Sequence, residues 1–410
     1  MRINPLAVVL TLLASGQHLS AEPAKQTAPF VEAFLFSGDL AGGEKALTDE
    51  IKKTSDADGL NFQLGTLQFI RAVERLSQTL YGYGFNERVG MASEMVGIPI
   101  PHQPKPKTIS YDDCRKIMET WVADLQRAEE TLAGVKDPDV KMPLHFAMIR
   151  LDLDGDGKAA EEETIWRVFA RLGGAPTPEG SAALVIDFDR ADALWLRGYC
   201  HLLMALGDFV LAYDFRELFE RTGHLIFAKV KSPYDYLQTG PKVFEMASVD
   251  IADVIAFIHL LNFPLKDAER TKSALAHLQS MTKLSREMWK LVIAETDSGS
   301  EWIPNPKQTS VVPGGAVTEE MTKDWIVFLD ELDAILAGKK LIPFWRTDDG
   351  RGLNLHRILN EPQAFDLVLW IQGSAAAPYL EKGLITSPEV WQRLQRTFQG
   401  NFIGFAVWFN

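Results

Sequence analysis

The sequence predicts an all-α protein, and three observations point that way. Apolar residues recur with a period near 3.6 along most of the 410 residues. Stretches rich in Leu, Trp and Phe repeat at helical spacing. Alternating apolar and polar runs bounded by turn residues, which would indicate strands, are scarce. We therefore expect helical hairpins packed as an irregular α-solenoid or α/α array, with one helix–loop–helix unit inserted.

The apolar stripes place the helices in chain order. The first stripe runs from Leu67 to Leu80, and the second from Cys114 to Leu132. Ser110, three residues before Asp113, predicts a capping box at the start of the second helix. A third stripe follows Pro264 and consists of Leu275, Leu278, Met281, Leu284, Met288 and Leu291. Further helical stretches are expected near 190–221, 250–262, 320–337, 363–372 and 387–398.

Two proline-rich stretches interrupt the helical pattern. Residues 97–107 contain four prolines, which favour an extended connector. Residues 301–315 contain three prolines and two glycines, a composition typical of a loop. These stretches divide the mature chain into an N-terminal helical region (25–107), a central region (108–300) and a C-terminal region (301–410).

Residues 1–24 have the composition of a secretory signal peptide. Arg2 supplies a positive start, residues 6–14 (LAVVLTLLA) form an uncharged apolar run, and small residues follow up to Ala24. Later apolar stretches are broken by charges such as Arg197 and Asp208, so no later segment is expected to span a membrane. We expect the mature protein in a bacterial periplasm or outside the cell.

The charge balance excludes one class of partner. Lys and Arg number 42 against 55 Asp and Glu, giving a net charge of −13. Nucleic-acid binding needs clustered positive charge, so it is not expected. The two cysteines, Cys114 and Cys200, have no paired spacing for a zinc site. In an exported chain they allow either one disulfide or two buried free thiols.

Residues 152–163 (DLDGDGKAAEEE) carry the sharpest motif of the chain. Three aspartates alternate, so their carboxylates can converge on one point, and Gly157 permits the sharp turn that follows them. A hard cation prefers six to eight oxygen ligands. The expected Ca²⁺ ligands are the carboxylates of Asp152, Asp154 and Asp156, the backbone carbonyl of Lys158, and two oxygens of Glu163; water fills the place of Ala160.

With its flanks, this motif resembles the EF-hand family over residues 144–172. Apolar stripes on both sides predict an entering helix before the loop and an exiting helix after it. EF-hands usually pair, and no partner loop is found. A lone loop outside the cell needs only an affinity of about 10⁻⁴–10⁻³ M, which favours a constitutive structural calcium over a sensor.

A second resemblance concerns a turn. Gly207-Asp208-Phe209, followed by Ala212, resembles the turn of a tetratricopeptide repeat. Gly38-Asp39-Leu40, followed by Ala46, resembles the same turn more weakly. Such helical repeats typically bind peptides or proteins. The resemblance covers two short turns only.

The remaining candidate groups are interpreted as structural. Asp187 and Asp189 precede a predicted helix and are interpreted as capping residues, and Asp348 and Asp349 as part of a turn. Either pair could serve acid–base chemistry if it lined a cleft. Histidines in apolar helical patterns are interpreted as core or interface residues; they are His145, His201, His259 and His277. Tryptophans at core spacing are Trp195, Trp325, Trp370 and Trp391.

No catalytic motif is found, so no catalytic residue is assigned. The leading interpretation is an exported, non-enzymatic helical protein with a structural Ca²⁺, which binds or scaffolds a peptide or protein. The first alternative is a secreted α/α-toroid enzyme, glycosidase- or lyase-like, that uses carboxylates in a cleft. The second is a calcium sensor that exposes an apolar groove.

Overall fold

The computed structural model describes residues 28–85, 100–167, 185–238, 245–246, 249–310, 316–398, 400 and 406. The predicted signal peptide, residues 1–24, lies outside the described residues. So does the later part of the predicted exiting helix, beyond residue 167.

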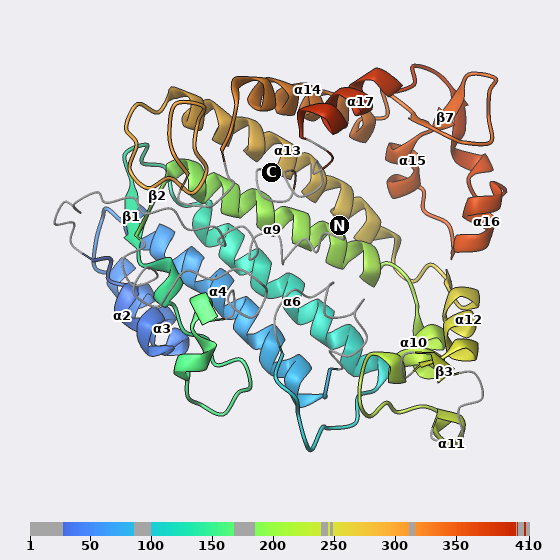
Figure 1. Cartoon of the computed structure of the whole chain (residues 1–410), viewed down its shortest axis with the longest axis horizontal. Helices are drawn as coiled ribbons and strands as arrows, with labels where there is room; N and C mark the ends of the chain where they lie inside the picture. Colours follow the sequence, from blue (N-terminus) through green and yellow to red (C-terminus); the bar gives the residue numbers. More distant parts are fainter. Residues whose placement is uncertain are drawn as a thin grey trace.

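Five long helices form the frame of the molecule (Figure 1). They are α4 (Asp58–Gly82), α6 (Tyr111–Leu132), α9 (Arg190–Leu211), α13 (Ala268–Ala294) and α14 (Glu319–Leu336). Each packs against the next one in the chain. Ion pairs show that neighbours run antiparallel: α6 meets α9 through Arg197 and Glu129 near one end, and α9 meets α13 through Asp208 and Arg270 near the other. The mainly helical prediction is confirmed.

Shorter elements complete the fold. The short helices are α2 (Glu32–Ser37), α3 (Leu40–Ile51), α10 (Arg216–Thr222), α11 (Asp235–Gln238), α12 (Ile251–His259), α15 (Leu355–Asn360), α16 (Leu367–Gln372) and α17 (Pro388–Thr397). The 3₁₀ turns are η1 (Phe146–Met148), η2 (Glu161–Glu163), η3 (Gly223–Leu225) and η4 (Ala377–Tyr379).

Strands are short and all pair antiparallel. Three pairs are β1 (Lys141–Leu144) with β2 (Ile186–Asp189), β3 (Glu245–Met246) with β4 (Val249–Asp250), and β5 (Asn262–Phe263) with β8 (Phe365–Asp366). A three-stranded sheet has the order β6 (Ile342–Pro343), β7 (Arg351–Leu353), β9 (Leu380–Lys382). The pair β1–β2 matters most for function, because it leads into the acidic loop.

Local sequence accounts for the helix starts. Ser110 caps α6: its hydroxyl accepts a hydrogen bond from the Asp113 amide at 3.2 Å, and the Asp113 carboxylate accepts one from the Ser110 amide at 2.9 Å. The predicted capping box is therefore confirmed. Asp189 caps α9 by accepting a hydrogen bond from the Ala191 amide at 2.7 Å, as its capping interpretation requires.

The core joins residues from Val31 to Phe398 in one large apolar cluster. Trp289 is wholly buried at its centre, and Trp195 and Trp325 are buried as predicted. Cys114 and Cys200 are free thiols, and only Cys200 is buried, whereas Cys114 is half-buried. The structure therefore contains no disulfide between them, and the second alternative is correct except for the burial of Cys114. Among the described residues, α9 is the one helix long and apolar enough to cross a membrane, but 67% of the relevant window is buried inside the molecule.

The turn predicted at Gly207 is wrong, because this residue lies inside α9. A Cβ atom at Gly207 would lie 2.5 Å from Cγ2 of Val122 on α6. The glycine therefore permits the close approach of two helices instead of ending one. At Gly38 a turn does occur: this residue has φ +73° and ends α2, and the Asp39 carboxylate caps α3.

Candidate calcium site

The three aspartates of the acidic loop converge as predicted. One carboxylate oxygen from each of Asp152, Asp154 and Asp156 lies within 4.8 Å of the others. Asp152 and Asp154 are partly buried, whereas Asp156 and Lys158 are exposed. Three carboxylates at this separation, without a cation, repel one another. The arrangement therefore suits a hard cation held by oxygen atoms.

Backbone amides hold these carboxylates in place. Oδ1 of Asp152 accepts hydrogen bonds from the amides of Gly155 at 2.8 Å and Asp156 at 3.1 Å, and its Oδ2 accepts one from Gly157 at 3.0 Å. Gly155 and Gly157 have φ of +73° and +84°, the left-handed region that favours glycine. The role predicted for Gly157 in the turn is therefore confirmed.

The Glu163 carboxylate accepts hydrogen bonds from two backbone amides of the loop. Its Oε1 accepts a hydrogen bond from the Leu153 amide at 2.8 Å, and its Oε2 accepts one from the Ala160 amide at 2.9 Å. The residue is only 9% exposed. Burial raises the pKa of this carboxyl, and the charges of Asp154 and Asp152 raise it further. A bound cation would oppose both effects, because it favours the charged carboxylate.

The predicted entering helix is wrong. Strand β1 and the turn η1 occupy this segment, and the base of the loop is closed by an antiparallel bridge between Arg150 and Thr164. The Ile165 amide donates to the Ile149 carbonyl at 2.8 Å. The backbone N–H and C=O groups of the segment before the loop form hydrogen bonds with β2 and with the chain after the loop. This segment therefore does not need to form a helix. A helix does begin at Ile165.

Helix α4 supports the start of the loop. Glu74 accepts a hydrogen bond from the Asp152 amide at 2.9 Å, and Ser77 and Gln78 donate to the carbonyls of Leu153 and Asp152 at 3.0 and 2.8 Å. Burial raises the pKa of Glu74 to about 7, and the nearby Asp152 and Glu163 charges add to the rise. Sequence reasoning missed these three residues. Their spacing places them on one face of a helix, so the sequence predicts a polar stripe there. It does not indicate which segment this stripe contacts.

The turn between α2 and α3 contacts the acidic loop at Ala159. A Cβ atom at Gly38 would collide with Cβ of Ala159. The Arg150 amide also donates to the Leu35 carbonyl at 2.9 Å. The loop therefore connects three parts of the fold: the α2–α3 turn, helix α4, and the chain that follows β1.

A second acidic cluster lies where β1 and β2 meet the end of α13. Glu295, Asp297 and Glu301 each bring one carboxylate oxygen within 4.8 Å of the others. The Lys141 ammonium lies 3.4 Å from Asp297, 3.7 Å from Glu295 and 3.8 Å from Asp189. The cluster therefore already contains a cation, a lysine side chain.

Asp187 does not cap a helix, contrary to its capping interpretation. Its Oδ1 atom is buried and has no hydrogen-bond partner among the described residues. Burial raises the pKa of Asp187 and that of Glu301. Burial also raises the pKa of Glu295 to about 8, and a hydrogen bond with Asp189 contributes. The pKa of all three carboxyls is therefore raised, and burial is the largest cause in each.

Replacing Glu295 by glutamine is expected to flatten the pH dependence of stability. The folded chain retains this proton up to about pH 8, whereas an unfolded glutamate releases it near pH 4.5. The folded state therefore loses stability as pH rises between these values. Urea unfolding at about pH 5 and about pH 8 measures the effect, with Asp348→Asn as an exposed control. An unchanged pH slope in Glu295→Gln would contradict the assignment.

Two partly buried histidines make a helix–helix contact. His201 on α9 and His277 on α13 face each other, with their Nδ1 atoms 2.8 Å apart. Glu129 lies 3.5 Å from His201, and Asp208 lies 3.7 Å from His277. Burial lowers the pKa of His277, and the neighbouring His201 lowers it further. The interface interpretation is confirmed for this pair.

In the part of the chain that the structure describes, one surface pocket of about 130 Å³ lies between α4 and α6, and another of about 130 Å³ lies between α14 and α17. Neither is lined by residues of the acidic loop or of the second acidic cluster. No family model, curated protein or solved structure matches the chain. The functional inferences that follow rest on the geometry of these residues.

Proposed function

We propose that this is an exported, calcium-binding helical protein whose Ca²⁺ is a structural component. The ligands are the carboxylates of Asp152, Asp154, Asp156 and Glu163 and the backbone carbonyl of Lys158. The observation that carries the proposal is the convergence of three aspartates within 4.8 Å, fixed by backbone amides and two left-handed glycines. This donor set consists of hard oxygen atoms, which prefer calcium over softer metals.

A structural role fits the position of the loop better than a sensor role. Calcium sensors open two helices about the loop, but the chain before this loop is a strand and a 3₁₀ turn. Contacts from α4 and from the α2–α3 turn hold the loop in place. A cation here would stabilise all three attachments by neutralising the carboxylates between them.

We infer that the helical frame acts as a binding or scaffold protein for a peptide or protein, in the periplasm or outside the cell. The consecutive antiparallel helices support this role. We propose that they form an irregular α-solenoid or α/α array. The alternative, a secreted all-α enzyme, is supported by the raised pKa of Asp187, Glu295 and Glu301. Hydrolysis of a polysaccharide by the wild-type protein, lost in Glu301→Gln, would favour the enzyme.

Thermal unfolding with chelator and then with calcium tests the proposal. Calcium at ten times Kd is expected to stabilise the protein by about 1.4 kcal/mol, a rise of a few degrees in Tm. Asp154→Asn should weaken calcium binding and so shift the rise to higher calcium, because it removes one negative charge from the proposed ligand set. The asparagine oxygen can still accept the hydrogen bond of the Asp156 amide, which keeps the loop in place. Glu162→Gln is the matched control, since Glu162 is an exposed loop carboxylate outside the proposed ligand set.

Two outcomes would contradict the proposed calcium site. One is a wild-type Tm that ignores calcium up to the millimolar range. The other is a shift of the rise in Glu162→Gln as large as that in Asp154→Asn, which would indicate a nonspecific effect of loop charge.

A further inference from the structure

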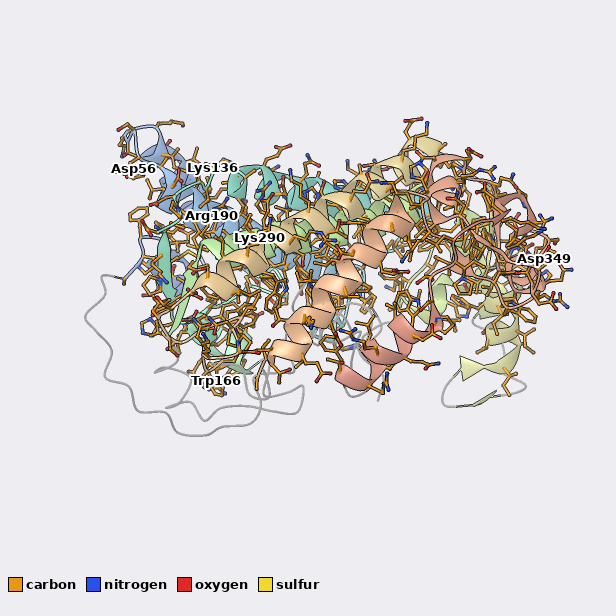
Figure 2. All side chains as sticks on the ribbon, turned by 90° about the horizontal axis from the view of Figure 1, so that it is seen from above. Asp56, Lys136, Trp166, Arg190, Lys290 and Asp349 are labelled. Carbon is orange, nitrogen blue, oxygen red and sulfur yellow. The ribbon has the colours of Figure 1, made fainter. Side chains whose placement is uncertain are left out.

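Two histidines face each other part-way along the contact between α9 and α13. Arg190, at the start of α9, and Lys290, near the end of α13, lie close together in Figure 2, as expected for antiparallel neighbours. Further along this contact, the Nδ1 atoms of His201 and His277 are 2.8 Å apart. Their side chains are 13% and 14% exposed, so both rings are largely removed from water.

The four ring nitrogens determine how many protons this pair holds. At 2.8 Å the two Nδ1 atoms form one hydrogen bond, so one of them donates a proton and the other accepts it. Nε2 of His201 lies 3.5 Å from Glu129. Nε2 of His277 lies 3.7 Å from Asp208. A carboxylate favours an N–H group beside it, so each Nε2 carries a proton. The geometry therefore fits three protons on four nitrogens, which is one positive charge shared by the pair.

A second positive charge does not fit the closed contact. It would place a proton on each Nδ1 atom, and two N–H groups that face each other at 2.8 Å repel and have no acceptor between them. Two imidazolium rings in one helix contact also repel each other as like charges. The rings of His201 and His277 must therefore separate before the pair takes the second proton.

The charged groups around the pair do not offset a second positive charge. Glu129 on α6 accepts a hydrogen bond from Arg197 on α9 at 2.9 Å. Asp208 on α9 forms an ion pair with Arg270 on α13. Both carboxylates face the histidines, but an arginine already neutralises each of them. The buried Cys200 adds no charge, because burial raises the pKa of its thiol.

The pKa shifts agree with this arrangement. Burial alone would raise the pKa of Glu129, but hydrogen bonds from His201 and Arg197 lower it to about 2, so this carboxylate stays charged where histidines titrate. Burial lowers the pKa of His277, and His201 lowers it further. The charges of Asp208 and Glu129 act in the opposite direction without reversing the shift. Because an unfolded histidine takes a proton more readily, the folded contact loses stability as pH falls below 6.5.

We propose that His201 and His277 form a pH-sensitive latch between α9 and α13. One shared charge keeps the latch closed, and a second proton breaks the Nδ1 contact and loosens the adjoining turns of α13 from α9. The change extends to α14 and α15, because Leu275 of α13 packs with Leu336 and Leu359 of these helices. Acid therefore loosens the C-terminal part of the helical frame.

Nuclear magnetic resonance of the histidine rings tests the proton count. The wild-type protein, labelled at its histidines, is titrated from about pH 8 to about pH 4.5, and the variants His201→Gln and His277→Gln assign the two resonances. We expect the pair to titrate in two linked steps. The second step should lie at least about one pH unit below that of His259, an exposed histidine on α12.

Hydrogen exchange measures the opening of the helix contact. After correction for the intrinsic pH dependence of exchange, amide protection over residues 268–280 is expected to fall about tenfold between about pH 7 and about pH 5, as a displacement of one pH unit implies. His277→Gln and His201→Gln should each abolish this fall, because glutamine keeps a hydrogen-bonding group but takes no proton. His259→Gln is the matched control and should behave like wild type.

Three outcomes would overturn the proposal. The first is a His201 and a His277 that each titrate in one step, at the pH of His259. The second is wild-type protection of α13 that does not change between the two pH values. The third is an equal fall in wild type and in both glutamine variants of the pair, because the titrating group would then lie elsewhere. If a variant fails to fold, the first two measurements on the wild-type protein still decide the question.

Discussion

Glu163→Ala is expected to destabilise the protein by about 2–4 kcal/mol even in chelator. The substitution leaves the Leu153 and Ala160 amides without the acceptor they have in the folded loop. Leu153 is buried, so the loss of its acceptor costs about 1–3 kcal/mol, whereas Ala160 is exposed and its amide costs less because water can replace the acceptor. The same substitution should remove the calcium response, because it deletes the proposed ligand that closes the loop. Urea unfolding with and without calcium separates the two effects.

Glu162→Ala, one residue earlier, provides the comparison. Glu162 is exposed, so its substitution should change stability by less than about 0.5 kcal/mol and leave the calcium response intact. If Glu163→Ala and Glu162→Ala had the same stability in chelator, the anchoring role of Glu163 would be wrong. If Glu163→Ala still responded to calcium like wild type, its role as a ligand would be wrong.

Gly207→Val is expected to destabilise the protein by about 2–3 kcal/mol. The new Cβ would lie 2.5 Å from Cγ2 of Val122, so α6 and α9 would have to move apart. Overpacking of a core contact costs about 1–3 kcal/mol, and a β-branched residue inside a helix adds a smaller penalty. Thermal and urea unfolding of Gly207→Val measure the loss.

A second substitution tests the cause of that loss. Val122→Ala removes the atom that collides, so the double variant Gly207→Val/Val122→Ala should lose less stability than the two single variants added together. Additive losses would show that Gly207 serves some purpose other than the approach of α6 and α9.

Local sequence patterns were sufficient for the long helices and for the turn of the acidic loop. The stripe from Cys114 to Leu132 and the Ser110 capping box correspond to α6 and its cap. The alternating aspartates before Gly157 correspond to converging carboxylates and a left-handed glycine. These features depend on residues within a few positions of one another, so they can be predicted without knowledge of the rest of the chain.

Contacts between distant segments decided the rest. The chain before the loop is extended because β2, about 45 residues away, pairs with β1. Gly207 permits the close approach of α6 and α9 because Val122 is its neighbour. Asp187 lies beside the second acidic cluster because the chain just after α13 reaches it. Glu74, Ser77 and Gln78 meet the loop across more than 70 residues of sequence.

The sequence by itself therefore determined the helical class and the donor set of the proposed calcium site. Tertiary structure alone decided what encloses that site and which apolar helix faces remain uncovered. The physical reason is that helix periodicity and loop geometry come from local backbone hydrogen bonding, whereas burial depends on which distant surfaces meet. An apolar stripe predicts that a helix face will be covered, and only the folded chain reveals that α12 and α16 have no buried residue.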